Sequence, residues 1–247
     1  MQIRYAIGLF AVVFFGSVVV NTPAGLLVEP LARQHVFLEG VSGSIWRGQA
    51  QNLSARANGE VISWGRVQWQ LSPLSLLSLA PSVQFSTELG SQWLQAEVRV
   101  HDLDAIQLND VQGRIPAGLV RLFAPLSVDG AFEFHFPRLE WSQSEGVLAL
   151  EGALRWINGV WITQIDRVRL GTYVLALESK GDEITGLVST VKGPVQVTGD
   201  LRARQQNYSL DVRIEPSGPA EQRLRDNLAL IAQAEGSGLR IKLSGQY

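Results

Sequence analysis

Residues 130–136 read GAFEFHF, and this stretch decides the fold class. Its three phenylalanines, Phe132, Phe134 and Phe136, alternate with Ala131, Glu133 and His135. Alternation with a period of two is typical of a β-strand with one apolar and one solvated face. We therefore expect the phenylalanines to be buried and Glu133 and His135 to lie on a wetter face.

The same alternation recurs in residues 94–101, 210–215 and 239–243. It predicts a mainly β protein with an antiparallel, curved sheet or a sandwich-like arrangement, and one or two short helices. Dipeptides that favour turns lie between the strands, at Asn58-Gly59, Asp129-Gly130, Glu145-Gly146, Lys180-Gly181 and Asn158-Gly159. The last predicts a type I′ hairpin that brings Trp156 close to Trp161.

Two segments have helical spacing instead. Residues 219–234 place apolar side chains three and four positions apart, and residues 116–123 are long enough for two turns. Each segment lies between strand-like stretches, which favours an internal duplication of about 36–135 and 136–247. Two copies of so loose a pattern also arise by chance.

The N-terminal run Tyr5 to Val20 has no charged residue, and Arg4 precedes it. As a helix, the run would extend about 24 Å, slightly less than a hydrocarbon core. We interpret residues 1–28 as a single transmembrane anchor with its N-terminus in the cytoplasm, and residues 29–247 as an exported β-rich domain. The alternative is a cleaved signal peptide with Thr22-Pro23-Ala24 as the cleavage site.

Composition excludes several classes of function. The chain has 21 basic and 23 acidic residues, a net charge of −2, which gives no electrostatic reason to bind nucleic acid. It has no cysteine, so thiol catalysis, cysteine-based zinc sites and disulfides are excluded.

No catalytic motif is present in the sequence. The three histidines, His35, His101 and His135, are far apart and form no metal-ligand pair. The closest carboxylate pairs, Asp102 with Asp104 and Asp182 with Glu183, have the character of turn or solvated residues. We therefore expect no enzyme activity, no cofactor and no metal, and we interpret the seven tryptophans as core residues and not as sugar-stacking platforms.

Several motifs resemble a known family, protein N of bacterial type II secretion systems. The resemblance is carried by the N-terminal anchor and by the motifs GSIWRGQA (43–50), WQLSPLSLL (69–77), GAFEF to RLEW (130–141), EGALRW (151–156) and NYSL to LSGQY (207–247). It implies a bitopic inner-membrane protein with a periplasmic β-rich domain that is an accessory part of the secretion apparatus. It implies no catalysis.

We take Gly43, Trp46, Gly48 and Trp69 as the candidate interaction or structural motif. The partners expected from the resemblance are other secretion subunits, with the membrane contacted through the N-terminal helix. The alternative is a periplasmic module that binds or transfers a lipid or another apolar ligand. A curved open sheet with one apolar face can bury that face against an acyl chain.

Overall fold

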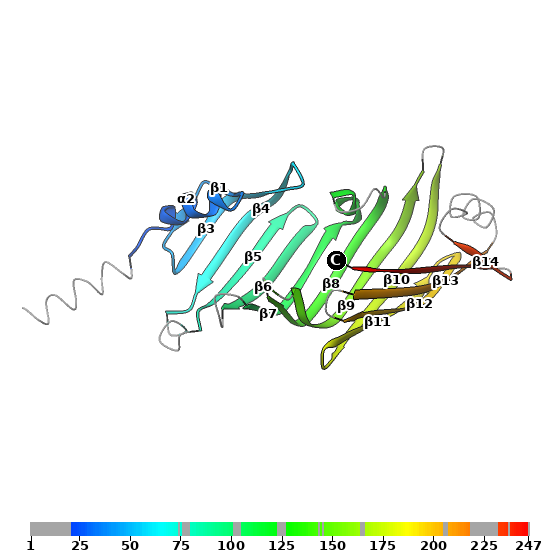
Figure 1. Ribbon diagram of the computed structural model, residues 1–247. Helices are drawn as coiled ribbons and strands as arrows, with labels where there is room; N and C mark the ends of the chain where they lie inside the picture. The colour runs from blue at the N-terminus through cyan, green and yellow to red at the C-terminus, as the bar shows by residue number, and fades with distance from the viewer. Residues whose placement is uncertain are drawn as a thin grey trace, which may run out of the picture. The chain divides into compact units, whose positions relative to one another are not determined.

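The computed structural model describes residues 21–73, 75, 80–100, 105–122, 127–142, 144, 146–163, 166–204, 207–217, 232–236 and 238–246. The chain divides into two compact units, Met1–Gly90 (unit 1) and Ser91–Tyr247 (unit 2). Both units are built mainly from antiparallel strands, which confirms the predicted β class (Figure 1).

Unit 1 is an antiparallel sheet with the strand order β1-β3-β4-β5, and the two-residue β2 also pairs with β3. A 3-10 helix and a short α-helix precede the sheet, and the α-helix contacts β1. The elements are η1 (Ala24–Leu27), α2 (Val28–Arg33), β1 (Val36–Glu39), β2 (Ser42–Gly43), β3 (Arg47–Ala57), β4 (Glu60–Leu71) and β5 (Ser82–Leu89).

The turn between β3 and β4 is the predicted Asn58-Gly59. Asn58 has a φ of 50° and Gly59 a φ of 84°. Positive φ at both central residues is what a type I′ hairpin requires. This turn prediction is confirmed.

Unit 2 is a larger antiparallel sheet with the order β6-β7-β8-β9-β10-β11-β12-β13-β15-β14. Along it the strand direction turns steeply, so that β12, β13 and β15 run across the direction of β8 and β9 in Figure 1. The elements are β6 (Gln92–Val100), β7 (Ala105–Pro116), η2 (Ala117–Leu122), β8 (Val128–Ser142), β9 (Gly146–Ile162), β10 (Arg167–Lys180), β11 (Glu183–Lys192), β12 (Val195–Arg204), β13 (Asn207–Pro216), β14 (Gln233–Glu235) and β15 (Gly238–Gln246).

The predicted hairpin at Asn158-Gly159 is wrong, because β9 continues through both residues. Asn158 has a φ of 50°, whereas Gly159 does not have positive φ. One left-handed residue does not reverse the chain; it inserts a β-bulge, and the pairing of β9 shifts register on both neighbouring strands nearby. Trp156 therefore pairs with Tyr173 and Trp161 with Val168 on β10, instead of the two tryptophans facing each other across a hairpin.

The predicted helix at residues 116–123 is confirmed in part, as the 3-10 helix η2. Of the helix predicted at 219–234, residues 219–231 lie outside the described residues. Gln233 and Ala234 belong to the strand β14, so the predicted end of that helix is wrong. Ala234 pairs with Leu239 on β15. This strand pairing outweighs the helical spacing of the apolar residues.

Alternation along β8 is confirmed, but burial is less than expected. Phe132, Phe134 and Phe136 are half-buried, as is Glu133, and His135 is exposed. The assignment of the tryptophans to a core is wrong for Trp93 and Trp141, which are exposed, and is met only in part by the other five, which are half-buried. The reason is that each unit has one sheet among its described residues, with no second layer of a sandwich to cover the apolar side chains.

The predicted anchor, residues 1–28, lies largely outside the described part of the chain, which begins at Asn21. From Asn21 onward, no helix in the described ranges combines the length and apolar character needed to cross a membrane.

Candidate functional site

The four residues of the predicted motif lie together in unit 1, at the corner where β2, β3 and β4 meet. Gly43 on β2 pairs with Gly48 on β3, and Gly48 pairs with Trp69 on β4. Gly43 has a φ of 90°, and a Cβ at this position would lie 2.5 Å from the carbonyl oxygen of Arg47. Only glycine fits this backbone without strain.

The indole of Trp69 lies over Gly48 in this corner. A Cβ added to Gly48 would be 2.4 Å from Cζ2 of Trp69, so the ring occupies the space that any larger residue would need. The Nε1–H of Trp69 donates a hydrogen bond to the carbonyl of Ile45 at 3.2 Å. Trp46 is half-buried, and its carbonyl accepts a hydrogen bond from the backbone N–H of Leu71 at 2.7 Å.

The same corner holds the segment that follows residues 1–20. The backbone N–H of Ile45 donates to the carbonyl of Thr22 at 3.0 Å, and Pro23 forms a β-bridge with Ser44. Ala24 is completely buried. Ser44 and Ile45, which lie between Gly43 and Trp46 in the sequence, thus fasten the N-terminal segment to the sheet of unit 1.

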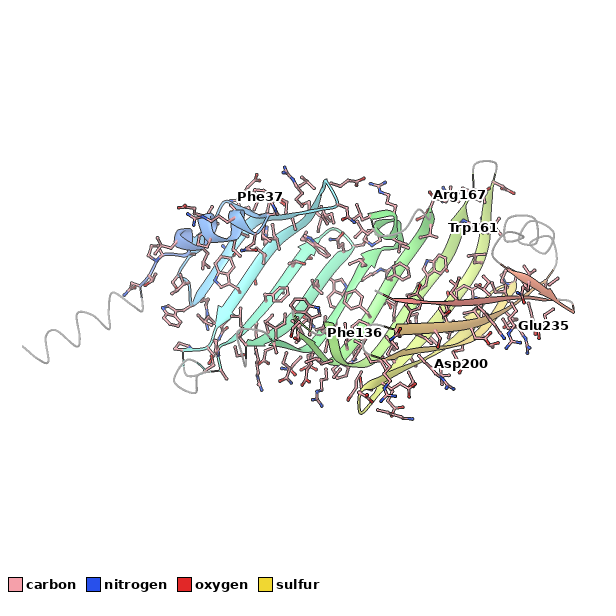
Figure 2. The ribbon with its side chains drawn as sticks, viewed as in Figure 1. Phe37, Phe136, Trp161, Arg167, Asp200 and Glu235 are labelled. Atoms are coloured by element: carbon pink, nitrogen blue, oxygen red, sulfur yellow. The ribbon has the colours of Figure 1, made fainter. Side chains whose placement is uncertain are left out.

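Unit 2 carries a second feature, a cluster of aromatic rings on one face of its sheet. We call Phe132, Phe134, Phe136, Trp156 and Tyr173 the aromatic cluster. The rings of Phe134 and Phe136 stack at 5.8 Å, and the ring of Trp156 lies 5.9 Å from Phe132 and 6.0 Å from Tyr173. Phe136 is labelled in Figure 2.

Tyr173 ties the aromatic cluster to the next part of the sheet. Its hydroxyl donates to the carbonyl oxygens of Leu170, at 2.7 Å, and Val195, at 3.0 Å. The one proton of the hydroxyl is therefore shared between two acceptors on β10 and β12. Burial raises the pKa of Tyr173 well above its ordinary value, so this phenol is neutral and acts as a structural donor.

The apolar face extends far beyond the aromatic rings. Directly paired residues lie on the same face of a sheet, and one row of such pairs crosses eight strands from β7 to β15. Its non-glycine members are all half-buried aliphatic or aromatic residues. We call this set the apolar row: Gly113, Phe134, Leu154, Leu175, Val188, Gly199, Val212 and Ile241.

The opposite face of the same strands is largely polar. The neighbouring row of pairs runs through Gln112, His135, Ala153, Ala176, Leu187, Asp200, Asp211 and Lys242. The sheet of unit 2 is therefore amphipathic over most of its width, with one apolar and one solvated surface.

At one end the apolar face closes on itself. Val168 on β10, Val195 on β12 and Leu239 on β15 form a buried cluster, each no more than 4% exposed. Half-buried side chains pack around it, and they include Trp161, which is labelled in Figure 2. The curl of the sheet thus turns the apolar face inward at this end, while the apolar row remains half-exposed.

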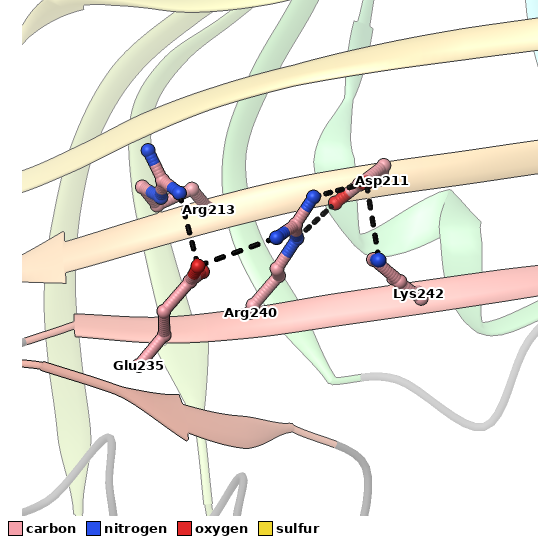
Figure 3. Close-up of polar contacts among 5 residues, drawn as sticks. All are labelled: Asp211, Arg213, Glu235, Arg240 and Lys242. Carbon is pink, nitrogen blue, oxygen red and sulfur yellow. Dashed lines mark hydrogen bonds and ion pairs between the residues drawn. The ribbon is translucent and has the colours of Figure 1, made fainter.

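Charged residues on the solvated face form ion pairs. Arg240 on β15 binds Asp211 on β13 through two hydrogen bonds of 2.8 Å, and also contacts Glu235 at 3.3 Å (Figure 3). Arg213 binds the same Glu235 at 3.2 Å. The hydrogen bonds from Arg240 hold the pKa of Asp211 below its ordinary value of 3.8. Sequence reasoning did not find this network, because partners 22 to 29 residues apart meet only once the strand register is known.

The carboxylates and histidines considered for catalysis or metal binding do not form a common site in the described part of the chain. Asp102, Asp104 and His101 lie outside the described residues. Asp182 accepts a hydrogen bond from Nε of Arg204 at 2.8 Å, which lowers the pKa of Asp182 and marks it as a surface ion pair. Within the described ranges, no group of three or more metal-ligating side chains comes together.

Comparison with known proteins assigns the sequence to a family. The sequence model of the family described as type II secretion system (T2SS), protein N matches residues 34–242. The chain belongs to this family. It is therefore a component of the type II secretion system, and the resemblance found in the sequence motifs is confirmed.

Two curated relatives cover nearly the whole chain. Type II secretion system protein N of Aeromonas hydrophila is 27% identical over 245 residues, covering 93% of this chain and 92% of the relative. The protein of the same name from Vibrio cholerae serotype O1 (strain ATCC 39315 / El Tor Inaba N16961) is 25% identical over 238 residues, with the same coverage. No solved structure matches the chain.

Proposed function

We propose that the chain is a non-catalytic accessory or assembly subunit of the type II secretion apparatus. In this proposal, the part of the predicted anchor before Asn21 lies in the bacterial inner membrane, and the chain from Asn21 onward forms a periplasmic domain that binds other secretion subunits. The observation that carries the proposal is the half-exposed apolar row of unit 2. Family membership supports the secretion context.

The half-buried side chains of the apolar row would be stabilised further if a partner covered them. Complete burial of a Val, Leu, Ile or Phe side chain stabilises by about 1.5–3 kcal/mol, so a half-buried side chain retains on the order of 1 kcal/mol for a partner that covers it. A contiguous apolar surface that stays partly accessible to solvent typically marks a binding site. A secretion subunit that covers several residues of the row would gain enough for specific association.

The corner in unit 1 supports a tethered mode of action. Ser44 and Ile45 fasten the segment beginning at Asn21 to the sheet, so a membrane anchor before Asn21 would hold unit 1 close to the bilayer. Confinement near the other subunits raises the effective concentration of each binding surface. An interaction module gains from such a tether, whereas a freely diffusing enzyme gains little.

Neighbouring substitutions on β11 test the proposed binding surface. Val188 belongs to the apolar row, and Leu187 lies on the opposite face and is 61% exposed. Val188→Asp should abolish crosslinking of the full-length protein to other secretion subunits and reduce secretion of a type II substrate. Leu187→Asp should leave both unchanged at equal protein level. Equal effects of the two variants, or no crosslink to any secretion subunit in the parent strain, would overturn the proposal.

A second candidate function is the binding of a lipid or another apolar ligand. The curl that joins Val168, Val195 and Leu239 favours it, because an apolar face that turns inward is shaped for an acyl chain. This function requires a constant lipid adduct in native mass spectrometry of the fragment from Asn21 onward, purified without detergent, and loss of the adduct in Val188→Asp. The subunit-binding function predicts a fragment free of tightly bound lipid.

A further inference from the structure

The strand β15 has an open outer edge in the described part of unit 2. On its inner side it pairs with β13 along residues 239–246. On its outer side it pairs with β14 only along residues 238–240. Residues 241–246 therefore present backbone N–H and C=O groups that no described residue satisfies.

Open strand edges pair readily with other strands, and proteins usually block them with charges, prolines or bulges. Residues 241–246 read Ile-Lys-Leu-Ser-Gly-Gln, with no proline and one charge. Leu243 lies in this segment and is 45% exposed, although it pairs with Leu210 on the apolar face. The edge thus combines an apolar side chain that is nearly half exposed with backbone groups that have no partner among the described residues.

We propose that β15 pairs antiparallel with β15 of a second copy of this chain, about a two-fold axis at Leu243. This register pairs residues 241–245 of the two copies and places Leu243 opposite its own counterpart and Lys242 opposite Ser244. The ladder ends at Gly245, because Gln233 of β14 holds the position beside Arg240. The interface is isologous, as two-fold dimers require. The contact is separate from the proposed binding of other secretion subunits and does not depend on it.

The sequence of β15 is complementary to itself in this register. Leu243 covers the exposed leucine of the partner on the apolar face. A shift of the axis to Lys242 would set two lysines directly opposite each other, which destabilises a sheet.

The contact is short, so the dimer belongs to the weak and reversible class. One charged pair can therefore shift its association measurably. Ser244 is exposed and lies opposite the partner's Lys242 in the proposed register. Ser244→Glu adds two opposite-charge pairs to the dimer, and Ser244→Lys adds two like-charge pairs. The dissociation constants of these variants should lie on either side of the parent value, with a change on the order of tenfold between them.

The absence of cysteine allows a direct test of the axis. Full-length Leu243→Cys, oxidised in its native membrane, should form a disulfide-linked homodimer, because opposite Cβ atoms in a strand pair lie within reach of a disulfide. Val191→Cys is the control, since Val191 is 54% exposed on β11, away from the edge. Analytical ultracentrifugation of full-length Ser244→Glu and Ser244→Lys in detergent gives the dissociation constants.

Three results would overturn the proposal: a parent chain that is monomeric at all concentrations, equal crosslinking of Leu243→Cys and Val191→Cys, or equal association of the two Ser244 variants. Crosslinking of Leu243→Cys to a different protein would assign the edge to a strand from that protein instead. Since Leu243 and Ser244 are both exposed, the substitutions leave the fold intact, and circular dichroism checks this.

Discussion

Gly48 is a single residue on which the corner of unit 1 depends. Its missing side chain leaves room for the indole of Trp69, which would lie 2.4 Å from an added Cβ and cannot move without losing its hydrogen bond to Ile45. Gly48→Ala should therefore lower the free energy of unfolding by roughly 1–3 kcal/mol, the usual cost of overpacking. Gly25→Ala is the matched control, because a Cβ at Gly25 meets no atom within 4 Å. Urea unfolding of both variants checks the difference, and equal midpoints would contradict the role of Gly48.

Phe134 and Glu133 are neighbours that test the register of β8. Phe134 lies in the apolar row and stacks on Phe136, so Phe134→Asp places a charge on the apolar face and should destabilise by about 2 kcal/mol or more. Glu133 forms an ion pair with Arg114 at 2.8 Å, with both side chains more than a third exposed. Glu133→Ala should cost less than about 1 kcal/mol. Thermal unfolding gives the loss of stability for both variants. A larger loss for Glu133→Ala than for Phe134→Asp would mean that Glu133, and not Phe134, lies on the apolar face.

At the scale of elements, the ion pairs between β13, β14 and β15 make the C-terminal edge of unit 2 sensitive to pH. Hydrogen bonds from Arg240 lower the pKa of Asp211 in the folded protein, so folding favours its ionised form. The resulting stabilisation is complete well above pH 3.8 and is lost as the pH falls through the lower folded-state pKa. Asp211→Asn should therefore be less stable than the parent at pH 7, and the gap should close below about pH 4.

Urea midpoints measured from pH 7 to pH 3 check this dependence. Glu215→Gln is the control, since Glu215 is an exposed carboxylate on the same strand with no ion pair among the described residues. Its difference from the parent should stay small at every pH. If the stability difference between the parent and Asp211→Asn did not change with pH, the ionised form of Asp211 would contribute nothing to the stability of the folded protein.

At the scale of the whole molecule, the central prediction is that the N-terminal segment before Asn21 is retained as a membrane anchor. The uncharged run from Tyr5 to Val20 follows Arg4, which favours a cytoplasmic N-terminus. A reporter fused after Tyr247 should then be active only if it is of a type that works in the periplasm. N-terminal sequencing of the membrane-bound protein should begin at the first residues of the chain. A mature protein that begins at Gly25 would identify a cleaved signal peptide instead.

The sequence by itself determined the β class, the alternation along β8 and the turn at Asn58-Gly59. These features depend on local chemistry: side chains alternate across any strand, and Asn-Gly readily adopts positive φ at both positions. The motifs also determined the family. The grouping of Gly43, Trp46, Gly48 and Trp69 was predictable only as a motif, whereas the attachment of residues 22–24 to Ser44 and Ile45 needed the structure.

Only the tertiary structure decided how the strands are used. Asn158-Gly159 has the same sequence as Asn58-Gly59, yet it forms a bulge, because the pairing of β9 with strands on both sides holds the chain extended. The tryptophans were expected in a core, yet none is buried, because burial depends on whether a second layer covers the sheet. The apolar row and the network at Arg240 join residues far apart in sequence, and a register that is not local cannot be read from local alternation.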